Sequence, residues 1–470
     1  MIQTKKTISE YDYKGDRPMK KRIIFLISIL IPGAILIYLA AAPLLFPQEN
    51  TAVLPGLSES EDATLPSESS GESLSSNPLA QESSEYPEYS KSSDPSESPD
   101  VFQEYDITLM ALGDNLMHMG IVNTGKQSDG TYDYSFLFQE ITDYLEAADL
   151  KVINQETIFG GNELGFSGYP YFNSPTQVGD AIAAAGFNVV LQATNHAADQ
   201  GINGIYHCVD FWKKYPQILQ TGISGESSEK EQSSIPLVTI KDVTFAILNY
   251  TYGPNMETLP SSLRGHLNML CAYNESSGAI DFTSLNPQVA EDIRQARQLA
   301  DIVIVFPHWG TEYQDRPSSY QKAFAQEMTE AGADLIIGTH PHVPQPVEWI
   351  TAENGNRALC YYSLGNYVST QKQALCMLEE MAWVTFHVTE DTVSIKDEDT
   401  GVLPLVCHYK SGPLRLEGIY PLEEYTEELA GSHGIRSYGG VALYLSDLQA
   451  WSQDIFGEWI LSSEDILGQP

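Results

Sequence analysis

The sequence has little positive charge and no paired cysteine motif. Its 470 residues include 25 lysines and arginines against 63 aspartates and glutamates, so the formal net charge is −38. A protein that binds nucleic acid needs a basic surface to neutralise phosphates, and this composition argues against nucleic acid as a partner. The five cysteines are scattered without a CxxC pair, which argues against a disulfide framework and a structural zinc site.

Charged side chains are absent from one long apolar stretch near the N-terminus. Residues 1–22 are polar and end in three basic residues, and 23–46 is uncharged over a length that can cross a bilayer as a helix. This asymmetry predicts a cytoplasmic N-terminus and an extracellular remainder of the chain. A cleaved signal peptide is the competing interpretation, since Ala40 and Ala42 resemble an A-x-A site. We favour a retained single-pass anchor in the cell membrane, because the apolar run is longer than a usual signal-peptide core.

Residues 47–105 are poor in apolar and basic side chains. They are rich in Ser, Glu and Pro, and Lys91 is their only basic residue. Such a composition buries too little apolar surface to offset its conformational entropy, which predicts a disordered linker. A globular domain is then expected over 106–410. The C-terminal extension, 411–470, is mixed and acidic, and its structure stays unassigned.

Two short apolar runs in the middle of the chain predict a β-α-β unit. Residues 301–306 and 334–337 are too short and too β-branched for helices, which indicates buried parallel strands. Between them, 320–331 has helical spacing and is followed by Gly332, a residue typical of a helix C-terminus.

Histidines follow both of these predicted strands. His308 comes after the first, and His340 and His342 come after the second. In open α/β sheets, ligands bind beyond the carboxyl ends of the strands, so the three imidazoles are expected to meet there and bind a metal ion. The alternative is that the three histidines serve hydrogen bonding or occur together by chance.

Polar residues also follow three strands that are predicted earlier in the chain. These strands are 106–112, which leads to Asp114, 150–154, which leads to Glu156, and 188–193, which leads to Asn195 and His196. Each residue alone could be a helix cap, but the repetition indicates a site. Carboxylates, an amide and imidazoles without thiolates suit divalent ions such as Mn²⁺, Fe²⁺ or Zn²⁺. A carboxylate from a middle strand could bridge two ions, which would leave His196 as a general acid or oxyanion stabiliser.

The order of the predicted elements favours an α/β fold in a layered α/β/β/α sandwich. Helices are expected at 136–147, 176–185 and 287–300, and a hairpin at 236–240 and 243–250. After Pro344 the pattern changes to alternating strands, which we assign to a second sheet: 347–350, 358–363, 382–388 and 392–395. Two sheets with outer helices form such a sandwich.

Six segments resemble, in order, the motifs of the CapA (PgsA) family of bacterial capsule and poly-γ-glutamate synthesis proteins. They are GD at 113–114, NQE at 154–156, ATNHAADQG at 193–201, PHWGTEY at 307–313, GADLIIGTHPHVPQ at 332–345 and YSLGNYV at 362–368. The resemblance covers about residues 106–370. It implies a fold similar to the calcineurin-like metallophosphoesterases.

The resemblance also implies roles for the residues at the strand ends. Asp114 corresponds to the first metal-binding aspartate, Glu156 to the bridging carboxylate and Asn195 to the asparagine ligand. His196 corresponds to the catalytic histidine, and the remaining ligands are His308, His340 and His342. The phosphoesterase pattern has a further histidine where this sequence has Leu116, and His118 is out of register on an extended strand. One metal position is therefore expected to lack a ligand.

The sequence leaves three functions open. The first is an anchored extracellular factor that helps to synthesise or export poly-γ-glutamate or a related anionic envelope polymer, together with other capsule-synthesis membrane proteins. The second is a metal-dependent hydrolase of a cell-envelope phosphoester or amide, and the third is a binding module without catalysis. Repulsion between the acidic chain and a polyanion is screened within about 8 Å at physiological salt, and bound divalent ions can invert it locally.

Overall fold

The computed structural model describes residues 102–226 and 235–468. The predicted cytoplasmic tail and membrane anchor, and the predicted linker up to residue 101, lie outside these residues. Among the residues described, no helix combines the length and the apolar character needed to cross a membrane.

The first sheet is built around β1 and has the strand order β17-β16-β14-β1-β2-β3-β4. The strands β1 to β4 run parallel, and β14, β16 and β17 continue the sheet in antiparallel fashion. Two short strands, β13 and β15, pair with β1 and β14. The bounds are β1 Tyr105–Asn115, β2 Leu150–Asn154, β3 Val189–Leu191, β4 Leu219–Thr221, β13 Asn366–Val368, β14 Leu378–Val388, β15 Val393–Ile395, β16 Gly401–Lys410 and β17 Arg415–Pro421.

The second sheet has the order β11-β12-β10-β9-β6-β5. Its central strands β6, β9, β10 and β12 are parallel, and β5 and β11 pair with the two edges as antiparallel neighbours. The bounds are β5 Leu237–Ile240, β6 Val243–Thr251, β9 Ile302–His308, β10 Leu335–Ile337, β11 Pro344–Thr351 and β12 Arg357–Leu364. A separate hairpin joins β7 (Cys271–Tyr273) to β8 (Ile280–Leu285).

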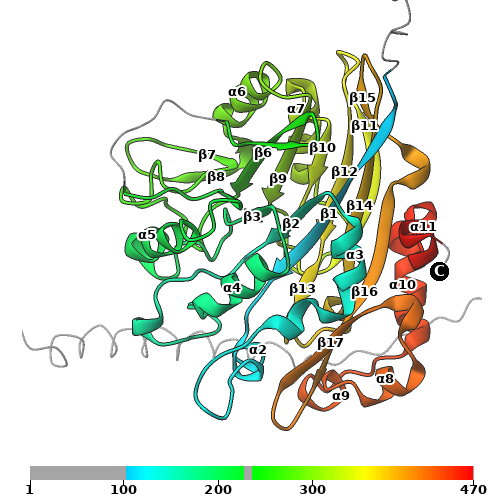
Figure 1. The fold of residues 1–470 in the computed structure, drawn as a ribbon. Helices are drawn as coiled ribbons and strands as arrows, with labels where there is room; N and C mark the ends of the chain where they lie inside the picture. Colours follow the sequence, from blue (N-terminus) through cyan, green and yellow to red (C-terminus); the bar gives the residue numbers. More distant parts are fainter. Residues whose placement is uncertain (1–101, 227–234, 469–470) are drawn as a thin grey trace, which may run out of the picture. The chain divides into compact units, whose positions relative to one another are not determined.

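Helices flank the two sheets (Figure 1). Beside the first sheet lie α2 Met119–Thr124, the 3-10 helix η2 Ser135–Ile141, α3 Thr142–Ala147, α4 Thr176–Ala184 and α5 Gly201–Trp212. Beside the second lie α6 Pro287–Ala296 and α7 Ser319–Ala331. The C-terminal helices are α8 Glu427–Ser432, α9 Ile435–Tyr438, α10 Leu445–Phe456 and α11 Ser463–Leu467, and the short 3-10 helices are η3 Asn162–Leu164, η4 Ala374–Met377, η5 Asp397–Asp399, η6 Leu422–Glu424 and η7 Gly457–Trp459.

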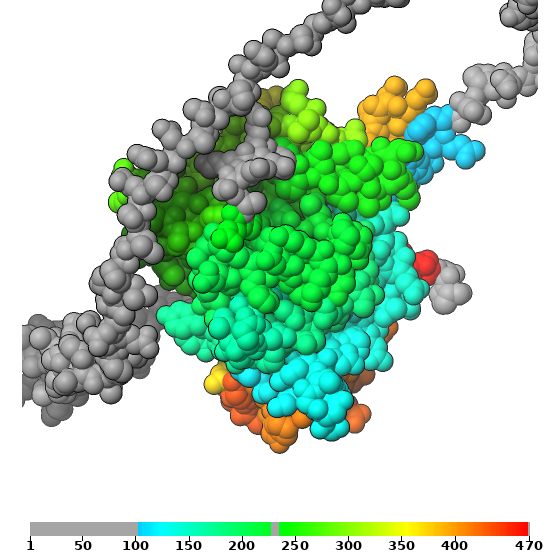
Figure 2. Space-filling model, turned by 60° about the vertical axis from the view of Figure 1, so that its left-hand side comes forward, coloured from blue at the N-terminus to red at the C-terminus, as the bar shows by residue number. Residues whose placement is uncertain are grey.

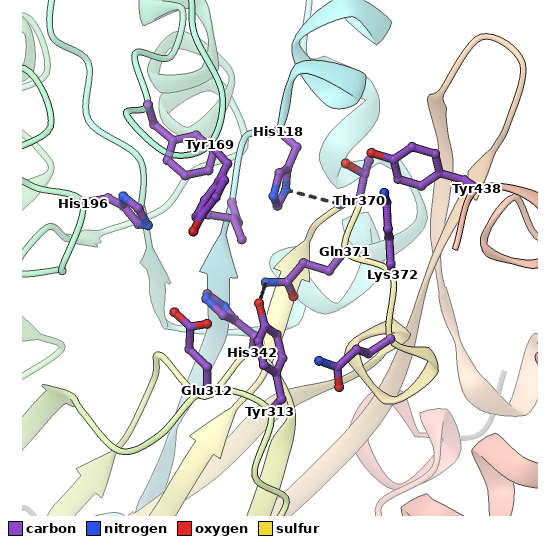
Figure 3. A pocket seen from close by; sticks show the side chains of 13 residues that line it. His118, Tyr169, His196, Glu312, Tyr313, His342, Thr370, Gln371, Lys372 and Tyr438 are labelled. Atoms are coloured by element: carbon purple, nitrogen blue, oxygen red, sulfur yellow. Dashed lines mark hydrogen bonds between the residues drawn. The ribbon is translucent and has the colours of Figure 1, made fainter. Parts of the chain in front are cut away.

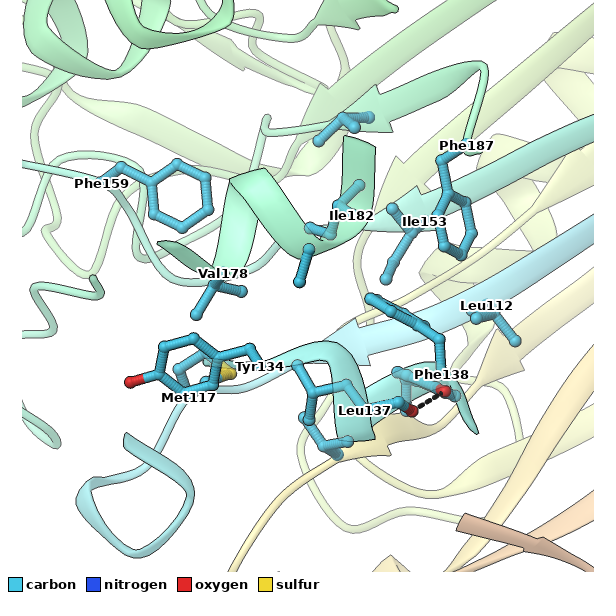
Figure 4. Close-up of a cluster of buried hydrophobic side chains, with 14 of the residues drawn as sticks. Leu112, Met117, Tyr134, Leu137, Phe138, Ile153, Phe159, Val178, Ile182 and Phe187 are labelled. Atoms are coloured by element: carbon cyan, nitrogen blue, oxygen red, sulfur yellow. Dashed lines mark hydrogen bonds between the residues drawn. The ribbon is translucent and has the colours of Figure 1, made fainter. Parts of the chain in front are cut away.

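Three apolar clusters lie between these layers. Alternate residues of β1 face opposite sides, so Leu109 packs between the sheets while Leu112 packs against the outer helices. Figure 4 shows the latter cluster, in which Leu112 of β1 and Ile153 of β2 lie near Phe138. Each fully buried side chain of this size contributes about 1.5–3 kcal/mol. Surface ion pairs contribute only about 0–1 kcal/mol each, so apolar packing dominates the stability of the fold.

The predicted mixed α/β class is confirmed, and one assignment of strands is wrong. The four strands expected to form a second sheet after Pro344 divide between the two sheets: β11 and β12 pair beside β10, whereas β14 and β15 pair beside β1. Both pairs are buried and alternating in sequence, and alternation does not specify which sheet a strand joins. The predicted helix at 136–147 is interrupted at Ile141, where the 3-10 helix ends.

The C-terminal residues continue the same folded unit. The strand β17 pairs with β16, and α10 contacts β11. The early and late parts of the domain also meet at one edge, seen as cyan and orange segments in Figures 1 and 2. There the backbone N–H of Leu416 donates to Thr124 Oγ1 at 3.0 Å. Residues 411–470, which the sequence left unassigned, therefore belong to the packed domain.

Two buried histidines lie in this C-terminal part. His433 uses both ring nitrogens, because Nε2 donates to the Cys407 carbonyl at 2.8 Å and Nδ1 accepts from the backbone N–H of Ile435 at 3.0 Å. His408 Nδ1 lies 2.6 Å from the hydroxyl of Tyr425. Burial lowers the pKa of both imidazoles to about 4. In the folded protein, therefore, both are neutral near pH 7.

We expect acid to destabilise the fold through His433. Its pKa is lowered in the folded state, so between about pH 6.5 and 4 the unfolded state binds more protons and stability falls as pH falls. The loss between pH 7 and pH 5 should be about 1–2 kcal/mol for this residue. Urea unfolding at both pH values measures it. His433→Gln should be less stable at pH 7 but lose less on acidification; parallel pH dependences for variant and parent would contradict this role.

Candidate metal centre

Strand ends from both sheets meet at one edge of the sandwich. Asp114 lies near the end of β1, in register with Asn154 of β2 and Asn366 of β13. His308 is the last residue of β9. The preceding Gly113 permits this arrangement, because a Cβ there would lie 2.1 Å from the carbonyl oxygen of Gly365. The first sheet thus supplies carboxylates and the second supplies imidazoles.

Five of the predicted residues form two groups that could hold metal ions. Glu156, His308 and His340 offer one set of ligand atoms, and Asp114, Glu156 and His342 offer the other. Within each set the ligand atoms lie within 4.8 Å of one another, and all five residues are buried. Glu156 belongs to both sets. The structure therefore places a carboxylate between two potential cation positions.

Hydrogen bonds hold the Asp114 carboxylate in place. Asn154 Nδ2 donates to Oδ1 at 2.8 Å, and the backbone N–H of His340 donates to Oδ2 at 3.2 Å. His342 Nδ1 lies 3.1 Å from the same Oδ2. The side chain is thus oriented from both sheets at once. Such outer contacts fix the direction of a ligand and raise its affinity for a metal.

Glu156 has no such partners. Both carboxylate oxygens are buried and accept no hydrogen bond among the described residues, and Nδ1 of His340 is likewise unpartnered. Burial, and then the charge of Asp114, raise the pKa of Glu156 well above its usual value. A buried carboxylate without donors is unfavourable by several kcal/mol, about the cost of an unpaired buried ion. A divalent cation would supply the missing partner, so these residues fit a metal.

The imidazoles are suited to the same purpose. Burial lowers the pKa values of His308 and His340 well below their usual value, which keeps both rings in the neutral form that binds metals. Burial also acts to lower the pKa of His342, but Glu156 and the hydrogen bond to Asp114 raise it to about 9. His342 is thus the cation that faces the two carboxylates in this structure.

His308 connects the predicted asparagine ligand to the cluster. Its Nε2 lies 2.9 Å from Asn195 Oδ1, and its Nδ1 lies 2.9 Å from Thr339 Oγ1. Asn195 Nδ2 donates to Asn255 Oδ1 at 3.2 Å. The amide of Asn195 is therefore next to the first ligand group, as the sequence predicted.

The loop between β10 and β11 holds two histidines in an unusual backbone conformation. His340 has φ +101° and His342 has φ +60°, in the left-handed region that residues with a Cβ seldom adopt. The backbone N–H of Tyr313 donates to the Pro341 carbonyl at 2.8 Å, and Asn366 Nδ2 donates to the His342 carbonyl at 3.0 Å. Local strain of this kind persists where surrounding contacts enforce it, most often at functional sites.

His196 is not in either ligand group but lies beside them at the wall of a pocket (Figure 3). Its Nδ1 is 2.8 Å from Asp199 Oδ2, which also accepts from the backbone N–H of Phe172 at 2.7 Å. The Phe172 ring packs edge-on against the imidazole at 4.7 Å between centroids. Asp199 thus fixes the ring and directs Nε2 away from itself. The pocket has a volume of about 360 Å³ and is also lined by His342 and Glu312.

Several residues of the site had no predicted role. Asn366 Oδ1 lies 3.1 Å from His342 Nδ1, and Asp199 orients His196. Both lie inside the motifs that carry the family resemblance, so a search of those motifs for second partners would have found them. His118 was expected to be out of register on an extended strand. The strand ends at Asn115 instead, and the turn before α2 brings His118 to the pocket beside Leu116.

Removing two ligands should abolish metal binding. In His340→Ala/His342→Ala each cation position loses one imidazole, and too few donors remain to compete with water. We expect the parent protein to retain at least one divalent ion, measured by elemental mass spectrometry after gel filtration, and the double variant to retain none. His207→Ala/His266→Ala removes two imidazoles outside the centre and serves as the control. Equal metal content in both double variants would contradict the site.

Comparisons with known proteins agree with the motifs. A family model described as "Bacterial capsule synthesis protein PGA_cap" matches residues 108–371. "Capsule biosynthesis protein CapA" of Bacillus anthracis is 27% identical over 310 residues, 64% of this chain and 67% of that protein. "PGA biosynthesis protein CapA" of Bacillus subtilis (strain 168) is 31% identical over 207 residues, 44% of this chain and 48% of that protein.

The solved structures add one distant likeness. A hypothetical protein from Thermus thermophilus has a TM-score of 0.35 and 12% identity, and the match covers 63% of this chain and 99% of that one. This likeness is too weak to support an argument. The matched segment spans about half of the Bacillus subtilis relative, so that protein's activity is not transferred here. The family match, in contrast, covers more than half of the chain, and the chain therefore belongs to the bacterial capsule synthesis protein family PGA_cap.

Proposed function

We propose that the chain acts in the production of an anionic capsule polymer, poly-γ-glutamate or a related polymer, as a metal-dependent hydrolase of an amide or phosphoester. The observation that carries the metal chemistry is Glu156, a buried carboxylate shared by two ligand groups with both oxygens unpartnered among the described residues. Membership of the capsule family and the printed names of the Bacillus relatives support the link to capsule polymer.

The proposed centre holds its cations between the two sheets. Glu156 bridges them, and the other ligands are Asp114, His308, His340 and His342, with Asn195 beside His308. Carboxylate and imidazole ligands without thiolates suit Mn²⁺, Fe²⁺ or Zn²⁺. When bound, a pair of such ions polarises the bond to be cleaved and neutralises charge that develops on its oxygens.

His196 supplies the proton in this proposal. Asp199 fixes one edge of the imidazole through Nδ1, so Nε2 can hold a proton toward the pocket and give it to the leaving group. Phe172 packs against the ring and donates its backbone N–H to Asp199, which limits rotation of the pair. The metal ligands remain in place whichever protonation state His196 has.

His196→Ala should separate catalysis from binding. The variant should keep its metal content and melting temperature, while activity falls by about two to four powers of ten, the usual range for a positioned proton donor. Asp199→Asn should reduce activity less, because the imidazole is retained. Capsule production in complemented cells and polymer hydrolysis by the purified chain measure the effect, with His207→Ala as the control. A lowered melting temperature with unchanged turnover would contradict the catalytic role and favour a binding module.

We further propose that residues 23–46 anchor the chain in the cell membrane and that the domain lies outside the cell, where the capsule polymer is assembled. Support comes from the basic residues before this stretch and their near absence after it. Protease added to intact protoplasts should release a fragment that begins within 47–105, because an exposed polar linker is readily cleaved. Immunoblotting of the medium detects it. A domain that stays protected until the membrane is broken would show the opposite orientation.

A further inference from the structure

The pocket beside the metal centre has one wall that lies beyond the family match. His342 and His196 line one side, and Lys372, Gln373 and Tyr438 line the other (Figure 3). The family match ends at residue 371, so these last three residues fall outside it. The residues common to the family thus hold the metal centre, and this chain adds a second wall of its own.

Close packing fixes this second wall. Tyr438 ends α9, and a Cβ on the following Gly439 would lie 2.9 Å from the carbonyl oxygen of Lys372. Only glycine allows the end of α9 to approach the loop so closely. Tyr409 of β16 also donates its hydroxyl to the Gln371 carbonyl at 2.9 Å. The loop that carries Lys372 is therefore held by the C-terminal part of the domain.

Lys372 is the only lysine or arginine among the residues that line the pocket. It is exposed, and within the described residues it makes no salt bridge. Its Nζ lies 4.5 Å from the centroid of the Tyr438 ring. An aromatic ring attracts the ammonium without neutralising it, so the charge remains available to an anionic ligand.

The other polar groups of the pocket suit a chain of amides and carboxylates. Gln371 Nε2 donates to the hydroxyl of Tyr313 at 3.3 Å, and Gln371 Oε1 accepts from Asn366 Nδ2 at 3.0 Å. Asn366 in turn contacts His342, so the second wall is connected to the metal ligands. Tyr169, Tyr313 and Tyr438 each bring a hydroxyl to the lining. One point charge with neutral donors fits single carboxylates better than phosphates, which favour clustered or bidentate cations.

We propose that Lys372 binds a side-chain carboxylate of a polyanionic amide polymer and so positions the polymer with its reacting bond at the metal centre. The inference rests on the proposed function and adds to it a subsite, with the residue that selects the substrate. Tyr438 positions the ammonium, and Gln371 and Gln373 provide neutral contacts on either side. The substrate then lies across the pocket, from Lys372 to His196.

The test measures binding of a fluorescently labelled γ-glutamate oligomer to the full-length chain in detergent, by anisotropy. Lys372→Gln should raise the dissociation constant about three- to tenfold, the range for one partly exposed ion pair. Lys372→Arg should restore most of the affinity, because it keeps the charge. Lys214→Gln is the matched control, since Lys214 also lies over an aromatic ring, 4.8 Å from Phe211, but far from the pocket lining. An amidated oligomer should be insensitive to Lys372→Gln.

Each contrary result has a separate meaning. Equal affinities for Lys372→Gln and Lys214→Gln would overturn the subsite and leave the proposed function intact, because metal content and the His196 variant test that function independently. Preference of the parent protein for a glycerol-phosphate oligomer would overturn the carboxylate assignment. Failure of the parent to bind any γ-glutamate oligomer would overturn both the subsite and the proposed polymer.

Discussion

The buried carboxylate of Glu156 is the constraint on which the site depends. A carboxylate enclosed by protein with no hydrogen-bond donor destabilises the fold by several kcal/mol, roughly the penalty for an unpaired buried charge. That penalty is a sizeable part of the usual net stability of about 5–15 kcal/mol, and no stable domain retains it without compensation. Divalent cations at the two ligand groups would offset it, so metal binding and folding are coupled in this domain.

The centre forms only if the two sheets are correctly packed. Asp114 and Glu156 come from the first sheet, whereas His308, His340 and His342 come from the second. The apolar cluster between the sheets therefore sets the distance between carboxylates and imidazoles. The strained backbone at His340 and His342 is a local consequence, since the loop must bring two imidazoles to carboxylates that belong to the other sheet. Core packing and metal geometry are in this sense one constraint.

Much of this arrangement could be predicted from the sequence because it depends on short-range patterns. The apolar runs that end in polar residues gave Asp114, Glu156 and the three histidines, and the structure brings all of them together. The assignment of strands to sheets failed for β14 and β15, since periodicity specifies burial but not partners. The position of His118 failed for a similar reason: the end of β1 at Asn115 depends on tertiary contacts that local sequence does not encode. The pocket wall at Tyr438 is the extreme case, because it lies far along the chain in a segment without recognisable motifs.

The charge of the chain gains a purpose from this geometry. A formal net charge of −38 repels a polyanion from most of the surface, although the repulsion is screened beyond about 8 Å at physiological salt. On the proposed function, attraction is confined to the pocket, where bound cations and Lys372 provide positive charge on opposite sides of the space beside His196. A basic surface would hold a long polymer at many unproductive positions. An acidic surface with one cationic pocket instead lets the polymer bind only where the reacting bond meets the metal centre, which converts electrostatic repulsion into selectivity for the productive position.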